Sequence, residues 1–464
     1  MKRLFLLLLL GYAWSAHAQL TPTPWTGGPL RVSANGRYLV HADPATGTNM
    51  PFFYLGDTAW ELFHRLNRDE AEYYLRRRAE QGFTVVQAVA LAELNGLNDP
   101  NPYGQKPLLN NDPTTPNPAY FEHVDWIIDK ARSLGIAVAL LPTWGDKLFK
   151  DRWGEGPEVF NVDNARTYGR WIGDRYKTRD NIIWVLGGDR TPREGSPDVA
   201  VWRAMAEGIQ QGVGGADKAL MTFHPQPNSV ADGGAGRWFQ ADAWFDFNMH
   251  QTGHCRDTPV YDYLTTSYNR QPTKPTMDAE PIYEDHPVCF NAKALGTSNA
   301  LDVRKSVYLS LFAGAHGQTY GCHDVWQLFA PGRTPVNGPH MSWKEALELP
   351  AASQMRFVRQ LLTSRPLLER VPDQSLIREN NYPPAERIQA TRGRTYAFVY
   401  SSAGRPFTLL LGKTEGKQLT AAWFDPRTGQ STPIGMYPNT GEQRFTPPTS
   451  GYGQDWVLTV DSGQ

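Results

Sequence analysis

Cysteine is scarce in this 464-residue chain, and net charge is nearly absent. The 46 lysines and arginines almost cancel the 47 aspartates and glutamates. Without net charge there is no field to hold a polyanion by counterion release, so we exclude nucleic acid as a partner. The three cysteines show no CxxC spacing, and we expect neither a metal ion nor another cofactor.

Long apolar runs are also missing. The run Leu4–Leu10 is far shorter than the roughly twenty residues that a membrane-spanning helix needs. Two basic residues precede it and Ala16-His17-Ala18 follows it, which is typical of a cleavable export signal over residues 1–18. We therefore expect a mature chain that starts near Gln19, has no membrane anchor, and resides in the periplasm or the medium.

The cysteines are Cys255, Cys289 and Cys322. In an oxidising compartment two of them can pair, and we favour Cys255 with Cys289 because both lie in loop-like stretches just after predicted strands. Three unpaired buried thiols are the alternative interpretation.

Aromatic residues, in contrast, are plentiful. The chain has 15 Trp and 20 Tyr, and its aromatic share is 12%. Flat ring faces suit the faces of sugars, but a large α/β core with many aromatic residues explains the same composition. The motifs must decide between the two.

Short apolar runs alternate with amphipathic stretches of helical period between about residues 50 and 330, a pattern typical of repeated βα units. The expected helices include residues 69–81, 120–134, 163–178, 199–211 and 301–312. The eight expected strands are "FFYLGD" ending at Asp57, "TVVQAVAL" from Thr84, "IAVALLPTW" from Ile136, "IIWVLGGD" ending at Asp189, "ALMTFHP" from Ala219, "WFDFNMHQ" from Trp244, "KPTMDAEP" from Lys274 and "HGQTYGCHD" from His316.

Eight such units suggest an α/β fold of the (β/α)8 TIM-barrel type, with a doubly wound open sheet as the competing topology. We favour the barrel because polar and aromatic residues collect at the C-terminal ends of the strands, where such a barrel builds its site. The catalytic barrel is expected over residues 19–370, with an N-terminal β-hairpin turning at Asn35-Gly36 and a last helix over 343–363. From 371 to 464 short alternating runs separated by Gly, Pro and Asn turns predict a small antiparallel β-sandwich.

Two carboxylates follow predicted strands on different sides of this barrel. In "WVLGGD" the glycines Gly187 and Gly188 allow a close approach just before Asp189, and in "TMDAEP" Glu280 comes before a proline that ends ladder pairing. Glycosidic cleavage needs one carboxyl group that donates a proton and another that stays ionised. A gap of about 5 to 5.5 Å predicts retention and roughly 6.5 to 9.5 Å predicts inversion, which the sequence leaves open. Alone, Asp189 could equally cap a turn.

Further residues at the strand ends are expected to bind the sugar, although each also has a purely structural interpretation, such as a helix cap or core packing. A hydroxyl from Tyr283 could hydrogen-bond Glu280 and keep it ionised. The full set of expected substrate-binding residues is Asp57, Trp60, Gln87, Trp144, His224, Asn248, Gln251, His254, Tyr283, His323 and Trp326.

The segments "FFYLGDTAWELF", "WVLGGD", "FNMHQTGH", "DAEPIYED" and "FAGAHGQTYGCHDVWQ" together resemble the apiosidase-like glycoside hydrolases, family 140. The resemblance spans essentially the whole mature chain and implies a barrel followed by a C-terminal β-sandwich. It further implies that Asp189 is the acid/base, that Glu280 is the nucleophile, and that the enzyme cleaves apiose linkages in the pectic polysaccharide rhamnogalacturonan II. The Asn-Glu pair usual after the fourth strand of retaining barrels is replaced here by Gly188-Asp189.

Two alternatives remain open at this point. The same machinery could act on another plant or bacterial glycan, because loops rather than the fold set specificity. The barrel could also bind glycan without cleaving it. The expected partner in every case is a polysaccharide or oligosaccharide, and we favour a monomer. The sandwich could itself bind polysaccharide, but covering apolar surface of the barrel is the favoured role.

Overall fold

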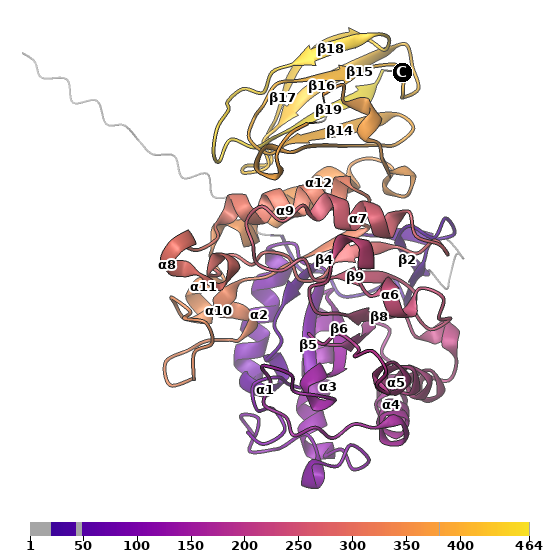
Figure 1. The fold of residues 1–464 in the computed structure, drawn as a ribbon, viewed down its shortest axis with the longest axis vertical. Helices are drawn as coiled ribbons and strands as arrows, with labels where there is room; N and C mark the ends of the chain where they lie inside the picture. The colour runs from indigo at the N-terminus through magenta and orange to yellow at the C-terminus, as the bar shows by residue number, and fades with distance from the viewer. Residues whose placement is uncertain (1–19, 43–48, 380, 464) are drawn as a thin grey trace, which may run out of the picture.

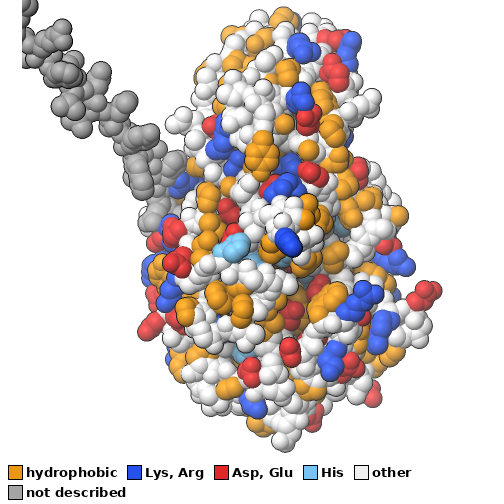
Figure 2. Space-filling view, turned by 60° about the vertical axis from the view of Figure 1, so that its left-hand side comes forward, with side chains coloured by type: hydrophobic (Ala, Val, Ile, Leu, Met, Phe, Trp, Pro, Cys, Tyr) orange, Lys and Arg blue, Asp and Glu red, His pale blue; other side chains and the backbone are white. Residues whose placement is uncertain are grey.

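The computed structural model describes residues 20–42, 49–379 and 381–463. The expected export signal and the cleavage position before Gln19 lie outside these ranges. Figure 1 shows a large α/β lobe below and a smaller β lobe above it, with the smaller lobe resting on α7, α9 and α12. Figure 2 shows that acidic and basic side chains are interspersed on the visible face rather than segregated. In the described ranges, no helix is both long enough and apolar enough to span a membrane.

The large lobe is built on a sheet of eight parallel strands, which confirms the barrel prediction. Neighbouring strands follow the order β8-β7-β6-β5-β4-β11-β10-β9. The ring closes between β8 and β9 through the Asp246 N–H, which donates to the Met221 carbonyl at 2.9 Å, and through Thr222 Oγ1, which donates to the Phe247 carbonyl at 2.6 Å. The strands are β4 Tyr54–Thr58, β5 Val85–Leu91, β6 Ala137–Thr143, β7 Ile182–Gly187, β8 Met221–His224, β9 Asn248–His250, β10 Thr276–Asp278 and β11 Gly317–Tyr320.

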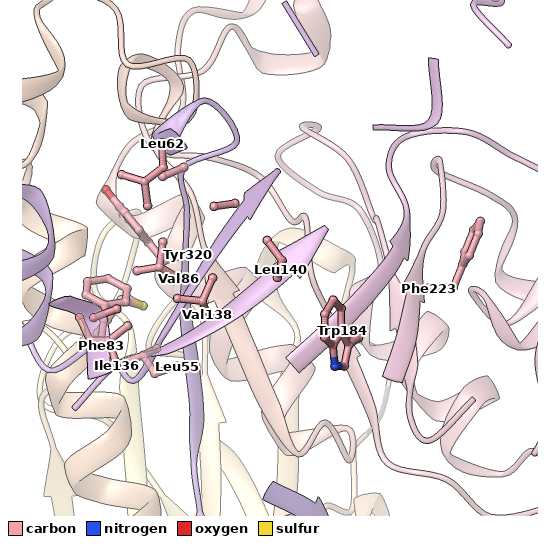
Figure 3. Close-up of a cluster of buried hydrophobic side chains, with 14 of the residues drawn as sticks. Leu55, Leu62, Phe83, Val86, Ile136, Val138, Leu140, Trp184, Phe223 and Tyr320 are labelled. Atoms are coloured by element: carbon pink, nitrogen blue, oxygen red, sulfur yellow. The ribbon is translucent and has the colours of Figure 1, made fainter. Parts of the chain in front are cut away.

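Strand side chains alternate between two separate apolar clusters. Val85, Val89 and Met249 belong to the cluster inside the barrel. Val86 and Trp184 belong to the cluster between the sheet and the helices, part of which Figure 3 shows. Because successive side chains on a strand point to opposite faces, a strand buried on both faces reads as a nearly continuous apolar run. This is why these strands could be predicted from the sequence.

The helices surround the barrel and begin at well-formed caps. Asn67, Asn161 and Asn299 each form a capping box at the start of α2, α4 and α9. The helices are α1 Leu62–Arg65, α2 Arg68–Glu80, α3 Pro118–Ser133, α4 Val162–Tyr176, α5 Asp198–Val213, α6 Gly236–Phe239, α7 Val260–Tyr268, α8 Ala292–Leu295, α9 Ala300–Phe312, α10 His323–Trp326, α11 Trp343–Ala346 and α12 Pro350–Thr363.

One continuous helix was expected over 343–363, but the structure has two helices there, α11 and α12, so the prediction of a single helix was wrong. Pro350 has no N–H to donate and restricts the residue before it. It therefore ends the first helix and takes the first position of the second.

The N-terminal segment forms an antiparallel sheet of three strands, β1 Leu30–Val32, β2 Leu39–Ala42 and β3 Asn49–Phe52. The expected turn is present, since the Gly36 N–H donates to the Ser33 carbonyl at 2.8 Å and Gly36 has a φ of 69°. Side chains of this sheet, including Leu39 and Phe52, join the cluster inside the barrel, as does Trp25 just before the sheet. The sheet thus supports the barrel interior and leads through β3 into β4.

The smaller lobe consists of antiparallel sheets, as the fold prediction requires. One has the order β12-β13-β14-β19-β16-β17 and the other pairs β15 with β18. The strands are β12 Val371–Pro372, β13 Ile388–Arg392, β14 Tyr396–Ser401, β15 Phe407–Leu410, β16 Gln418–Phe424, β17 Ser431–Pro438, β18 Glu442–Phe445 and β19 Trp456–Ser462.

The two lobes share apolar and charged contacts along α9. Tyr308 stacks on Tyr400 with ring centroids 4.8 Å apart and an interplanar angle of 13°. Arg304 forms a buried ion pair with Asp455 at 2.7 Å. Phe398 of β14 belongs to the same apolar cluster as the barrel helices. The sandwich therefore covers apolar surface of the barrel.

Candidate active site

β7 ends in a turn that places an acid over the barrel mouth. Gly187, Gly188 and Asp189 all have positive φ, at 88°, 108° and 51°. A Cβ on Gly187 would lie 2.4 Å from the His224 carbonyl oxygen, and one on Gly188 would lie 2.7 Å from Cε3 of Trp144. Only glycine fits both positions, because L side chains avoid this backbone region and no space remains for them. The two glycines thus let the chain turn sharply and carry Asp189 to the mouth.

The Asp189 carboxyl group lies in a mostly buried position, with 15% of its side chain exposed. Trp153 Nε1 donates a hydrogen bond to Oδ2 at 2.7 Å, and Arg190 Nη1 lies 3.7 Å from the same oxygen. Burial and the negative charge of Glu280 raise the pKa of Asp189 to about 6, against the opposing effects of Trp153 and Arg190. Asp189 is therefore protonated in mildly acidic solution, as a proton donor must be.

Glu280 lies in a different environment. It follows β10, and Pro281 comes directly after it. Its Oε2 is 3.2 Å from His224 Nε2, and its Oε1 is 3.3 Å from His254 Nε2. Burial by itself raises the pKa of Glu280, but the two imidazoles outweigh it and hold the pKa below the usual range. Glu280 is therefore ionised while Asp189 keeps its proton.

Aromatic side chains form the wall around these acids. The rings of Trp60 and Trp144 lie 5.0 Å apart, and the Trp60 ring lies 5.3 Å from the ring of His224. Tyr283 is buried, and the charge of Glu280 adds to burial in raising the pKa of its phenol. The Trp144 indole nitrogen and the Tyr283 hydroxyl have no hydrogen-bond partner of good geometry among the described residues. Both are buried polar groups without such a partner, in the wall next to the two acids.

A disulfide lies directly behind His254. Cys255 and Cys289 are bonded, which confirms the favoured pairing. The Cys289 N–H donates to the His254 carbonyl at 2.9 Å, and the imidazole of His254 stacks on His286 with centroids 4.0 Å apart. His254 Nδ1 lies 3.1 Å from the Pro281 carbonyl oxygen. These contacts fix the ring that faces Glu280. The third cysteine, Cys322, is free and buried.

Asp57 does not lie in the mouth, and the expectation that it binds sugar was wrong. It is fully buried and accepts hydrogen bonds from Arg78 Nε at 2.7 Å and from the Tyr74 hydroxyl at 2.5 Å. Leu55, two residues earlier, belongs to the cluster under the helices. The period of two therefore turns Asp57 toward α2.

Asn248 is a second incorrect expectation for the same reason. Its neighbour Met249 points into the barrel, so Asn248 points outward. Its Oδ1 accepts from the Gly236 N–H at 2.9 Å, and its Nδ2 donates to the Gly233 carbonyl at 2.8 Å and to Ser267 Oγ at 3.0 Å. The amide is fully engaged in holding a loop.

Gln87 points inward, but it lies below the mouth. Its Nε2 donates to the Ala279 carbonyl at 3.1 Å and to Thr58 Oγ1 at 3.3 Å, and its Oε1 accepts from the Tyr54 hydroxyl at 3.4 Å. With its donors and acceptor used, Gln87 is not a sugar ligand. It instead anchors the residue that precedes Glu280.

Of the remaining expected residues, some have all their polar atoms hydrogen-bonded within the protein and others keep an unpartnered one. His323 is fully buried, with Nε2 3.2 Å from the Asn337 carbonyl oxygen and Nδ1 accepting from Trp326 Nε1 at 3.4 Å, so both ring nitrogens are engaged. Gln251 is also buried, but its Oε1 has no partner among the described residues. Gln251 thus keeps an unpartnered acceptor, whereas His323 has no free ring nitrogen.

Two residues near the acids were not anticipated. Trp153 is 44% exposed in a loop after β6 and contacts Asp189 directly. Glu93 follows β5, and burial together with the charges of Asp189 and Asp146 raises the pKa of its carboxyl group. Polar, glycine-containing loops flank Trp153 in the sequence, but nothing local indicates that this loop lies over the fourth strand.

The histidines near Glu280 do not form a metal site. His250 and His254 are four residues apart, but His250 Nε2 contacts Ser267 Oγ at 2.5 Å, away from the mouth. In the part of the chain that the structure describes, no three His, Cys, Asp or Glu side chains are grouped so that they could hold a metal ion.

Comparison with known proteins agrees with this geometry. A family model described as "Apiosidase-like, catalytic domain" matches residues 33–369, and one described as "Putative collagen-binding domain of a collagenase" matches residues 371–461. A solved structure described as a glycoside hydrolase is 34% identical, with a TM-score of 0.85 and coverage of 96% of this chain and 99% of the other. A glycoside hydrolase family 5 structure from Bacteroides vulgatus ATCC 8482 is also 34% identical, with a TM-score of 0.85 and coverage of 96% and 95%. A search of curated proteins found no match.

Proposed function

Since the chain belongs to the apiosidase-like glycoside hydrolases, we propose that it cleaves apiose linkages in rhamnogalacturonan II by a retaining mechanism. That it is a glycoside hydrolase follows from the family and from the similar solved structures. The substrate, the stereochemistry and the residue roles are the proposal.

In the first step Asp189 gives its proton to the leaving oxygen while Glu280 attacks the anomeric carbon. The bond from that carbon to the leaving oxygen breaks, and a covalent glycosyl–Glu280 ester forms. In the second step the Asp189 carboxylate takes a proton from water as the water oxygen attacks the same carbon. The Glu280 carboxylate leaves, and both residues return to their starting states.

The contrast between the two carboxyl groups supports these roles. Glu280 faces two imidazole nitrogens at 3.2 and 3.3 Å, which favour its ionised form. Asp189 has one indole donor at 2.7 Å and the Arg190 guanidinium at 3.7 Å, but burial and the charge of Glu280 outweigh them and favour its protonated form. Two acids with pKa values moved in opposite directions are what an acid and a nucleophile require.

We further propose that the protein is exported and acts in the periplasm or the medium. The N-terminal sequence pattern and the disulfide between Cys255 and Cys289 support this, because such bonds persist in oxidising compartments.

The test is release of apiose from rhamnogalacturonan II oligosaccharides by the wild type, Asp189→Asn and Glu280→Gln. We expect Glu280→Gln to lose almost all turnover. Asp189→Asn should lose about 10²- to 10⁴-fold on the oligosaccharide but less on an activated aryl glycoside, whose leaving group needs little protonation. Equal activity of either variant and the wild type would disprove the residue assignment.

The anomer formed first, followed by NMR, decides the stereochemistry. Retention supports the covalent intermediate, whereas inversion would make Glu280 a general base. If the wild type releases no apiose but cleaves another member of a plant and bacterial glycan panel, the substrate part of the proposal fails and the glycosidase remains.

A further inference from the structure

A large open pocket lies among loops that follow β7 and β8, the strands that lead to Asp189 and His224. Its volume is about 790 Å³. This is within the range of about 300 to 1,000 Å³ typical of small-ligand sites. Three loops line it, which follow β6, β7 and β8, together with the start of α5 and one side of α6. The lining residues used below are Phe149, Thr191, Arg193, Gln226, Arg237 and Trp238.

The pocket is continuous with the site along the chain. Thr191 comes two residues after Asp189, and Gln226 comes two residues after His224. The Thr191 N–H donates to Gln226 Oε1 at 2.9 Å, which ties the two loops together. The pocket lining therefore starts two residues along the chain from both Asp189 and His224.

The pocket offers hydrogen bonds, a ring face and the carboxylates of Asp151, Glu158 and Glu194, while its two arginines are already paired. Arg193 forms an ion pair with Asp198 at 2.9 Å and lies over the Phe149 ring at 4.0 Å. Arg237 is likewise paired, with Asp232. Gln226 Nε2 has no hydrogen-bond partner among the described residues, and the Trp238 ring is partly exposed. An amide donor and an indole ring in one pocket suit the hydroxyls and the apolar face of a sugar, and the Arg237 guanidinium lies 5.8 Å from the centre of that ring.

We propose that this pocket binds the sugar residues on the leaving-group side of the glycan, through Gln226 and Trp238. The inference rests on the proposed function, since the side of the mouth that carries the proton donor is the side on which the leaving oxygen lies. In this proposal the sugar released after that oxygen is protonated extends toward Thr191 and into the pocket.

The first test compares two substrates that carry the same transferred sugar. One has an oligosaccharide leaving group and the other a nitrophenyl leaving group, which does not reach the pocket. The measured quantity is the ratio of kcat/KM for the oligosaccharide to kcat/KM for the nitrophenyl glycoside. We expect Gln226→Ala and Trp238→Ala each to lower this ratio about tenfold, the size of a moderate binding contact.

Trp126→Ala is the matched control, because Trp126 is also a partly buried tryptophan but lies on α3. It should leave the ratio at the wild-type value. If both pocket variants also leave the ratio at that value, the proposal is overturned. A general loss of folding would lower both kcat/KM values together and is thereby distinguished from a loss of leaving-group binding.

The second test does not depend on turnover. The oligosaccharide that remains after apiose removal is titrated by calorimetry into the wild type and into Gln226→Ala. We expect binding by the wild type and about tenfold weaker binding by the variant. Absence of binding by the wild type overturns the pocket while apiose release still supports the function; binding without apiose release supports the pocket and refutes the function.

Discussion

Replacing Trp153 with phenylalanine should move the alkaline limb of the activity profile to higher pH. In the proposed mechanism Asp189 donates a proton only from its protonated form, so kcat/KM should fall as the pH rises through its pKa of about 6. The Trp153 indole donates to the carboxylate at 2.7 Å and thereby favours the ionised form. Phenylalanine keeps the ring but removes this donor, so the pKa of Asp189 must rise.

The size of the change follows from the hydrogen bond. A bond to a charged group contributes about 1.5 to 3 kcal/mol. Trp153 is 44% exposed, and water replaces part of that contribution. We therefore expect the ionised form of Asp189 to lose about 1.4 kcal/mol of stabilisation. This raises its pKa by about one unit and places the alkaline limb near pH 7.

The assay is kcat/KM against pH for the wild type, Trp153→Phe and the control Trp126→Phe. The acidic limb, which reports Glu280, should stay in place in all three because its two histidines are unchanged. An alkaline limb of Trp153→Phe that stays in place or moves to lower pH would refute the reasoning.

Three further changes test the structural supports. Arg78→Met leaves Asp57 buried without its partner and should lower the free energy of unfolding by about 3 to 5 kcal/mol in urea titrations; a change under 1 kcal/mol would contradict the buried pair. Cys289→Ser opens a crosslink across 34 residues and should cost about 3 to 4 kcal/mol, read as a lower Tm than that of the non-reduced wild type. Gly188→Ala places a Cβ 2.7 Å from the Trp144 ring and should lower kcat more than tenfold, with the far-UV circular dichroism unchanged; wild-type turnover would show that the turn is not constrained.

The sequence allowed the barrel to be predicted, and it allowed both acids to be proposed, because the signals are local. Strands buried on both faces read as apolar runs, and Asp189 and Glu280 come directly after two of them. The errors arose where a residue at the end of a strand was assigned to the site without asking to which face of the sheet its side chain points. Leu55 points toward the helices and Met249 points into the barrel. Because side chains alternate along a strand, Asp57 and Asn248 must both point toward the helices, and this alternation could have excluded them as sugar ligands.

Other parts of the site could not be predicted from local sequence. Trp153 reaches Asp189 because the Arg190 guanidinium binds the Phe149 and Lys150 carbonyls, at 3.0 and 2.7 Å, and holds the loop in place. The stacking of His286 on His254 likewise joins loops that follow different strands. Such contacts depend on tertiary packing, which no spacing in the sequence encodes.

The contacts along α9 make the barrel and the smaller lobe depend on each other for stability. Without the smaller lobe, Tyr308 would lose its stacked partner and Arg304 would lose the carboxylate that compensates its buried charge. A recombinant barrel truncated after α12 would therefore expose an aromatic strip and an unpaired cation where solvent now has no access. The two lobes should denature in one cooperative transition, and an exchange of the C-terminal lobe between relatives should succeed only when the matching face of α9 is exchanged with it.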